Sequence, residues 1–148
     1  MATSRQFVCA HCATEKWAGG LFQTLQSCAN GKTEICECGR TKDLQLIFPF
    51  GLDAEKYFCK VLAVFLPKGL PETWPNSDGG SVEFYPFLVI GRKINDESHR
   101  TIWLPYWHII KYDSDRPTET KYGQWAPHLN LETFEDLVGQ ARQAGFLA

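Results

Sequence analysis

Two close pairs of cysteines near the N-terminus constrain the fold more than any other feature of this 148-residue chain. Cys9 and Cys12 form a C-x2-C pair. Cys36 and Cys38 form a C-x-C pair, which Gly39 follows. Each short spacing lets one turn present two sulfurs to the same ion, and four thiolates satisfy the tetrahedral coordination that Zn²⁺ prefers. The sequence therefore predicts one structural zinc, because a site closed by four cysteines leaves no open coordination position for catalysis.

This arrangement resembles the zinc-ribbon group, in which two cysteine turns at the ends of hairpins clamp one zinc. The resemblance covers residues 1–45, although the second spacing is short and the intervening loop is slightly long. Zinc ribbons perform many unrelated tasks, so the resemblance implies an architecture and not a function. Asn30-Gly31 is typical of a hairpin turn, which predicts a strand on either side and places Cys28 on the first of them.

Other roles for the cysteine-rich segment stay open. A redox C-x-x-C is expected beside a βαβ pattern, which the sequence does not indicate here. His11 is an alternative metal ligand, although adjacent residues rarely point at the same ion. Cys28 and Cys59 are more typical of small buried apolar residues than of ligands.

Composition and charge narrow the classes of protein. The chain is 44% hydrophobic and 22% charged, close to globular averages, so it is not expected to be disordered. A net charge of −2 argues against binding nucleic acid through a broad basic surface. The longest apolar run, residues 61–66, is too short to cross a bilayer. The first residues lack the apolar core of a secretory signal, so we expect a cytoplasmic protein without a membrane partner.

The remaining residues, 46–148, predict an antiparallel sheet. Residues 82–94 and 100–112 are long apolar stretches with the character of paired strands. Pro86 and Pro105 interrupt them, and since proline donates no backbone hydrogen bond, we expect bulges or edge positions there. Residues 60–67 predict a further strand. The polar stretches on either side of this pair predict two loops, residues 68–81 and 113–128.

A C-terminal helix is the clearest single element. Asn130 is a favourable helix cap, and Gly145 is suited to the C-terminal stop. Between them the apolar residues follow helical spacing: Leu131, Phe134, Leu137, Val138, Ala141 and Ala144. The predicted fold is therefore α+β, with an N-terminal zinc ribbon followed by an antiparallel sheet packed by this helix. The boundary near residue 46 is broad, and one cooperative domain is the alternative.

Residues 103–110, "WLPYWHII", concentrate aromatic side chains. Strand alternation predicts two faces, with Trp103, Trp107 and Ile109 on one and Leu104, Tyr106, His108 and Ile110 on the other. Core packing is the default for such rings. The alternative is a concave aromatic ligand site that contains Tyr106 and His108, with Trp74 or Trp125 from the flanking loops.

Two functions remain open on the sequence. The leading one is a non-enzymatic, zinc-stabilised binding or adaptor module for a protein or for a nucleic acid. A nucleic acid would be held locally through three cations near a hairpin at residues 95–99: Arg92, Lys93 and Arg100.

The other is a metal-dependent nuclease or other hydrolase that uses the acidic stretch at residues 113–121. The stretch contains Asp113, Asp115 and Glu119, of which two would hold Mg²⁺ while Lys121 supports the attacking water. The spacing of these residues is common by chance, so a solvated loop is the simpler interpretation.

Overall fold

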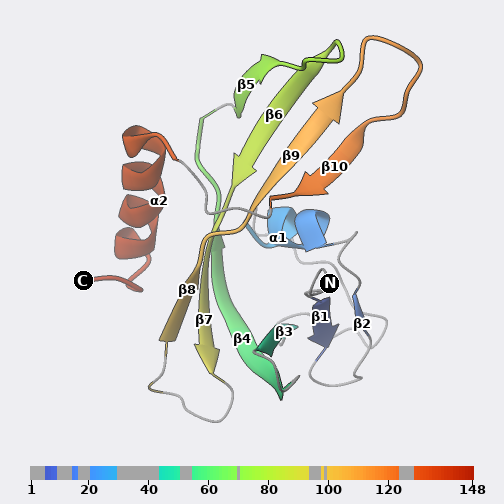
Figure 1. Ribbon diagram of the computed structural model, residues 1–148. Coiled ribbons are helices and arrows are strands. Elements are labelled where there is room, and N and C mark those ends of the chain that lie inside the picture. Colours follow the sequence, from blue (N-terminus) through green and yellow to red (C-terminus); the bar gives the residue numbers. More distant parts are fainter. Residues whose placement is uncertain are drawn as a thin grey trace. The chain divides into compact units, whose positions relative to one another are not determined.

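The computed structural model describes residues 6–9, 15–16, 21–29, 44–50, 55–69, 71–93, 98, 100–123 and 129–148. The chain divides into two compact units (Figure 1). Unit 1 comprises Met1–Val64 and Val89–Ile102, and unit 2 comprises Phe65–Leu88 and Trp103–Ala148. Two antiparallel sheets and a C-terminal helix make the chain α+β, as predicted, whereas most of the predicted zinc ribbon lies outside the described residues.

The sheet of unit 1 has the strand order β2-β1-β3-β4-β7-β8. Its strands are β1 (Gln6–Cys9), β2 (Glu15–Lys16), β3 (Leu44–Phe50), β4 (Glu55–Phe65), β7 (Leu88–Lys93) and β8 (Arg100–Trp103). Strand β3 pairs with β1 on one side and with β4 on the other. The predicted boundary between residues 45 and 46 therefore falls inside a strand that joins the cysteine-bearing segment to the rest of the sheet.

Residues 21–29 correct the prediction of a hairpin around Asn30-Gly31. Leu21–Ala29 is a helix, α1, so Cys28 lies on a helix and not on a strand. Phe22 and Leu25 are buried and Cys28 is half-buried, which is the spacing of one helical face. Asn and Gly are also common just after the last turn of a helix, so the dipeptide did not distinguish the two structures.

The sheet of unit 2 has the order β10-β9-β6-β5, and Figure 1 shows these strands side by side. Its strands are β5 (Glu72–Pro75), β6 (Ser81–Pro86), β9 (Tyr106–Lys111) and β10 (Glu119–Tyr122). The predicted antiparallel pairing of the two long apolar stretches is confirmed for β6 and β9. Residues 103–110 are not one strand, however. Trp103 is the last residue of β8, whereas Tyr106 begins β9, which belongs to the other sheet.

The two prolines explain this interruption. Pro86 is paired with Tyr106 at the end of the β6–β9 ladder, and the amide of Phe87 then donates to the carbonyl of Pro105 at 2.9 Å. Pro105 itself is fully buried. Because neither proline donates to the ladder, the paired strands leave one sheet at this point and continue in the other as β7 and β8.

Strands β5 and β10 correct the prediction of two loops. Trp74 lies on β5, and Glu119 and Lys121 lie on β10. Both strands are short edges with mostly exposed residues, so neither has the alternation of buried and exposed side chains that a sequence pattern would reveal. They are held by backbone pairing to β6 and β9.

Helix α2 (Leu131–Gln143) follows the prediction closely. It begins after Asn130, which occupies the N-cap position although its side chain makes no capping hydrogen bond, and it ends before Gly145, whose φ is +82°. The amide of Phe146 donates to the carbonyl of Ala141 at 3.0 Å, and that of Gly145 donates to Arg142 at 2.9 Å. This is a Schellman stop, in which glycine accepts the left-handed conformation at little cost.

The helix is anchored to the segment that follows β4. Gln140 Nε2 donates to the carbonyl of Leu66 at 2.8 Å, and the amide of Lys68 donates to Asp136 Oδ2 at 2.9 Å. Leu137 is fully buried, whereas Leu131 at the start of the predicted apolar stripe is 70% exposed. The buried part of the stripe is therefore confined to its later turns.

Candidate functional site

One face of the unit 2 sheet is aromatic. The register pairs Phe84 with His108 and Trp74 with Val82, which puts these side chains on the same face as Tyr106. We call this set the aromatic face: Trp74, Phe84, Tyr106 and His108. Its ring centroids lie 5.4 Å apart for Phe84 and Tyr106, and 5.6 Å apart for Trp74 and His108. The structure thus brings together Trp74, Tyr106 and His108 from the predicted ligand site, and adds Phe84.

The aromatic face has a buried floor and an exposed edge. Phe84 and Tyr106 are buried, and His108 is half-buried. Trp74, on edge strand β5, is 38% exposed. A large ring that is open to solvent on one side and supported by other rings below is a suitable anchor for a ligand.

Gly123 fixes the position of Tyr106. Its amide donates to the carbonyl of Tyr106 at 2.9 Å, just beyond the end of β10. A Cβ atom at position 123 would lie 1.9 Å from Cε2 of the Tyr106 ring. The ring therefore rests directly on the backbone of Gly123, an approach that only glycine permits.

His108 is surrounded by rings. It lies 5.5 to 5.7 Å from Trp74, Tyr106 and Phe84, measured between ring centroids. Within the part of the chain that the structure describes, its imidazole has no hydrogen bond or ion pair. Burial lowers the pKa of His108 below its ordinary value, so the imidazole is neutral at pH 7.

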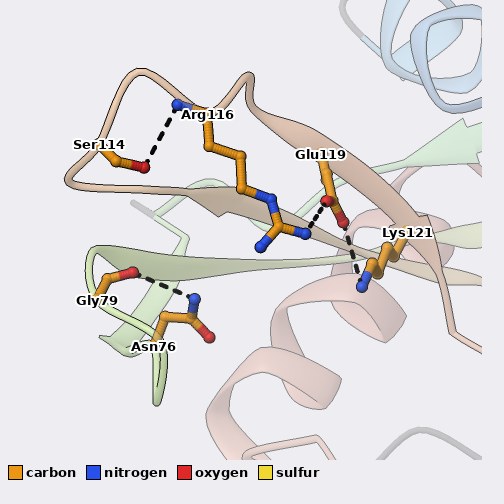
Figure 2. Close-up of polar contacts among 6 residues, drawn as sticks. All are labelled: Asn76, Gly79, Ser114, Arg116, Glu119 and Lys121. Atoms are coloured by element: carbon orange, nitrogen blue, oxygen red, sulfur yellow. Dashed lines mark hydrogen bonds and ion pairs between the residues drawn. The ribbon is translucent and has the colours of Figure 1, made fainter.

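The charges beside the aromatic face are mostly paired. Lys121 lies across from His108 on β10, and its Nζ is 3.2 Å from Glu119 Oε2. Arg116 donates to the other oxygen of Glu119 at 2.9 Å, as Figure 2 shows. The hydrogen bond from Lys121 is the main reason that the pKa of Glu119 is lowered. Glu72, on β5, has no hydrogen bond or ion pair with any described residue, so the unpaired charge of this face is negative.

The opposite face of the sheet contains core packing and a satisfied polar group. Trp107 is only 2% exposed, and its ring contacts those of Phe87 and Tyr122 at centroid distances of 5.4 and 5.2 Å. Glu83 accepts a hydrogen bond from the hydroxyl of Tyr85 and pairs with Lys111. Burial, followed by the bond to Glu83, raises the pKa of Tyr85 to about 12. Glu83 is thus paired with both Tyr85 and Lys111.

The acidic stretch proposed for a nuclease is used in turns and ion pairs. Asp113 Oδ2 accepts the amide of Gly80 at 2.8 Å, beside a turn in which Asn76 donates to Gly79 (Figure 2). Glu119 is shared between Arg116 and Lys121. Among the described residues, no group of three or more histidines, cysteines or acidic residues is arranged to hold a metal ion. The described geometry therefore gives the hydrolase hypothesis no support.

The remaining predicted site residues lie elsewhere. Arg92 and Lys93 are on β7 and Arg100 is on β8, in the other sheet. Trp125 lies outside the described residues. Of the predicted zinc ligands, Cys9 ends β1, where its backbone pairs with Leu44. The other three predicted ligands lie outside the described residues: Cys12, Cys36 and Cys38.

Protein-family models, curated proteins and solved structures give no match to this chain. No helix in the described ranges combines the length and the apolar character that crossing a membrane requires.

Proposed function

We propose that the protein is a non-enzymatic, zinc-stabilised binding module that recognises a protein partner through the aromatic face. The observation that carries the proposal is Trp74, which is 38% exposed although it rests on the ring of His108. Tryptophan is among the residues that contribute most to protein interfaces, because it buries a large rigid area with few torsions to freeze. Phe84 and Tyr106 supply a floor that does not need to rearrange on binding.

Charge favours a protein over a nucleic acid as the partner. Phosphate recognition needs cations that are free to neutralise it. Lys121, which lies across from His108, and Arg116 are both already paired with Glu119. Glu72, by contrast, stands unpaired among the described residues on the same strand as Trp74. The complementary partner is a segment that presents an apolar side chain to Trp74 and a basic one to Glu72.

A displayed library of random 12-residue peptides, selected on the full chain, tests this proposal. Enriched peptides should combine basic and apolar residues, and they should lose binding to Trp74→Ala and bind Glu72→Lys more weakly. Tyr122→Ala is the matched control, since Tyr122 is 39% exposed but lies on the opposite face. Equal binding to Trp74→Ala would exclude the aromatic face.

Single-stranded oligonucleotides form a second arm of the experiment. Saturable, salt-sensitive binding of a 20-nucleotide DNA, with no peptide enriched, would favour the nucleic-acid alternative. Cleavage of that DNA that needs Mg²⁺ and is lost in Glu119→Gln would instead favour the hydrolase.

The zinc is proposed as structural, with Cys9, Cys12, Cys36 and Cys38 as ligands. Two features of the backbone support this assignment. Strands β1 and β2 form an antiparallel pair whose connection, residues 10–14, includes Cys12. Cys9 pairs with Leu44, and only residues 39–43 separate Leu44 from Cys38, a span of at most about 20 Å. The topology is therefore compatible with both cysteine pairs at one end of β1. Thiolate ligation of this kind also suits the reducing cytoplasm, where we place the protein.

A further inference from the structure

A half-buried histidine among rings gives the aromatic face a second property. His108 contacts Trp74, Phe84 and Tyr106, and it makes no hydrogen bond or ion pair with another described residue. Imidazole is the side chain whose ordinary titration falls nearest to neutral pH. A neutral ring packs well among aromatics, whereas a charged one loses hydration there without gaining a partner.

The charged groups on the elements around His108 do not favour an imidazolium. On β10, Lys121 lies directly across from His108 and carries the same charge that protonation would create. Glu119, two residue pairs along the same ladder, is already engaged with Lys121 and Arg116. On β6, the face that carries Phe84 bears no charge, because Glu83 and Tyr85 alternate to the other side. On β5, Glu72 pairs with Phe84 and not with His108.

Trp74 depends on His108 for part of its support. Every residue of β5 is exposed, and among the described strands β5 pairs with β6 alone. The Trp74 ring meets Phe84 at 6.1 Å and His108 at 5.6 Å between centroids, so His108 provides the closer of these two contacts. Displacing the imidazole removes that contact from a ring on a weakly held edge strand.

We propose that His108 is a pH-sensitive latch, whose protonation releases Trp74 from the aromatic face and loosens β5 while the rest of unit 2 stays folded. The latch is a property of the fold and stands whether or not the aromatic face binds a peptide. Acidification would thus change the accessibility of the most exposed ring on this face.

Two measurements on the full chain test the latch between pH 7.5 and 5. NMR of the histidine ring protons should show His108 titrating below pH 6.5, and near-UV circular dichroism should change with the same midpoint. The transition should disappear in His108→Phe and in His108→Gln, and persist in the control His99→Phe. In Trp74→Phe the His108 titration should remain, whereas the dichroism change should lose most of its amplitude.

Several results would overturn the latch. A transition that persists with its midpoint unchanged in His108→Phe or His108→Gln would assign it to another group. A pKa of His108 above 6.5 would mean that the rings stabilise the imidazolium. Full amplitude in Trp74→Phe would show that Trp74 does not move. A simultaneous loss of far-UV signal would show global unfolding in place of local release.

Discussion

Truncation of Trp107 to alanine is the sharpest test of how the two faces of the unit 2 sheet differ. The ring is 2% exposed and lies between Phe87 and Tyr122. Removing about 150 Å² of buried aromatic surface costs about 4 kcal/mol at 25 cal/mol per Å². Each lost ring pair adds roughly 0.5–1.5 kcal/mol, so we expect a loss at or above the upper end of the ~3–5 kcal/mol range seen for such truncations.

Urea unfolding at pH 7.5 measures this loss, with intrinsic fluorescence and far-UV circular dichroism as two probes. Trp74→Ala is the matched control, because it removes the same side chain from a site that is 38% exposed. It should lower the free energy of unfolding by only about 1 kcal/mol, as partly exposed substitutions do. Equal losses in the two variants, or a loss below about 1 kcal/mol for Trp107→Ala, would refute the assignment of the faces.

Three further predictions concern other parts of the chain. Gly123→Ala should lower the free energy of unfolding by about 1–3 kcal/mol, because the new Cβ would lie 1.9 Å from the Tyr106 ring. Gly139→Ala should instead raise it by about 0.5–1 kcal/mol, because Gly139 lies in a helix with open space around it. Equal urea midpoints for the two variants would contradict this. Because burial lowers the pKa of His108 in the folded state, the unfolded chain takes up the proton first on acidification. The contribution of neutral His108 to the free energy of unfolding should therefore be fully present above pH 6.5. Below that pH it should be lost toward the folded pKa, by up to about 1.4 kcal/mol per pH unit. Urea melts of His108→Gln should lack this pH dependence, and the same dependence in the variant would exclude His108 as its source. Elemental analysis should find one zinc per chain, and this zinc should be lost when the C-x-C pair is replaced by serines; full retention of the zinc would contradict the structural site. Chelation should expose the amides of residues 7–40 to hydrogen exchange while Leu137 stays protected. A uniform loss of protection would show that the cysteine-bearing segment and the rest of the chain unfold together.

Elements with a strong local pattern were predictable from the sequence. Helix α2 combines helical spacing of apolar residues with a glycine at its end, and two long apolar stretches predicted the β6–β9 pair. Helix α1 was not predicted, because nine residues with an Asn-Gly at the end satisfy a strand and a helix equally well. Tertiary burial of Phe22 and Leu25 decides between them, and that information is absent from the local sequence.

Edge strands show a different limit. In β5 the sequence Glu-Thr-Trp-Pro has no alternation, and its residues are all exposed. The strand is defined by its backbone pairing with β6, and backbone pairing has no side-chain signature. The sequence therefore predicts Trp74 on a loop beside the ligand site, whereas the structure places it on a strand.

Phe84 was missed because the two prolines do not fix the register of the β6–β9 pair. Setting Pro86 directly opposite Pro105 would place Phe84 opposite Trp107, on the other face of the sheet. The structure instead pairs Pro86 with Tyr106, one residue further along, and so places Phe84 opposite His108. A difference of one residue in register thus decides whether Phe84 lies with Tyr106 and His108 or with Trp107. The composition of the aromatic face is therefore a consequence of the register, for which the local sequence carries no signal.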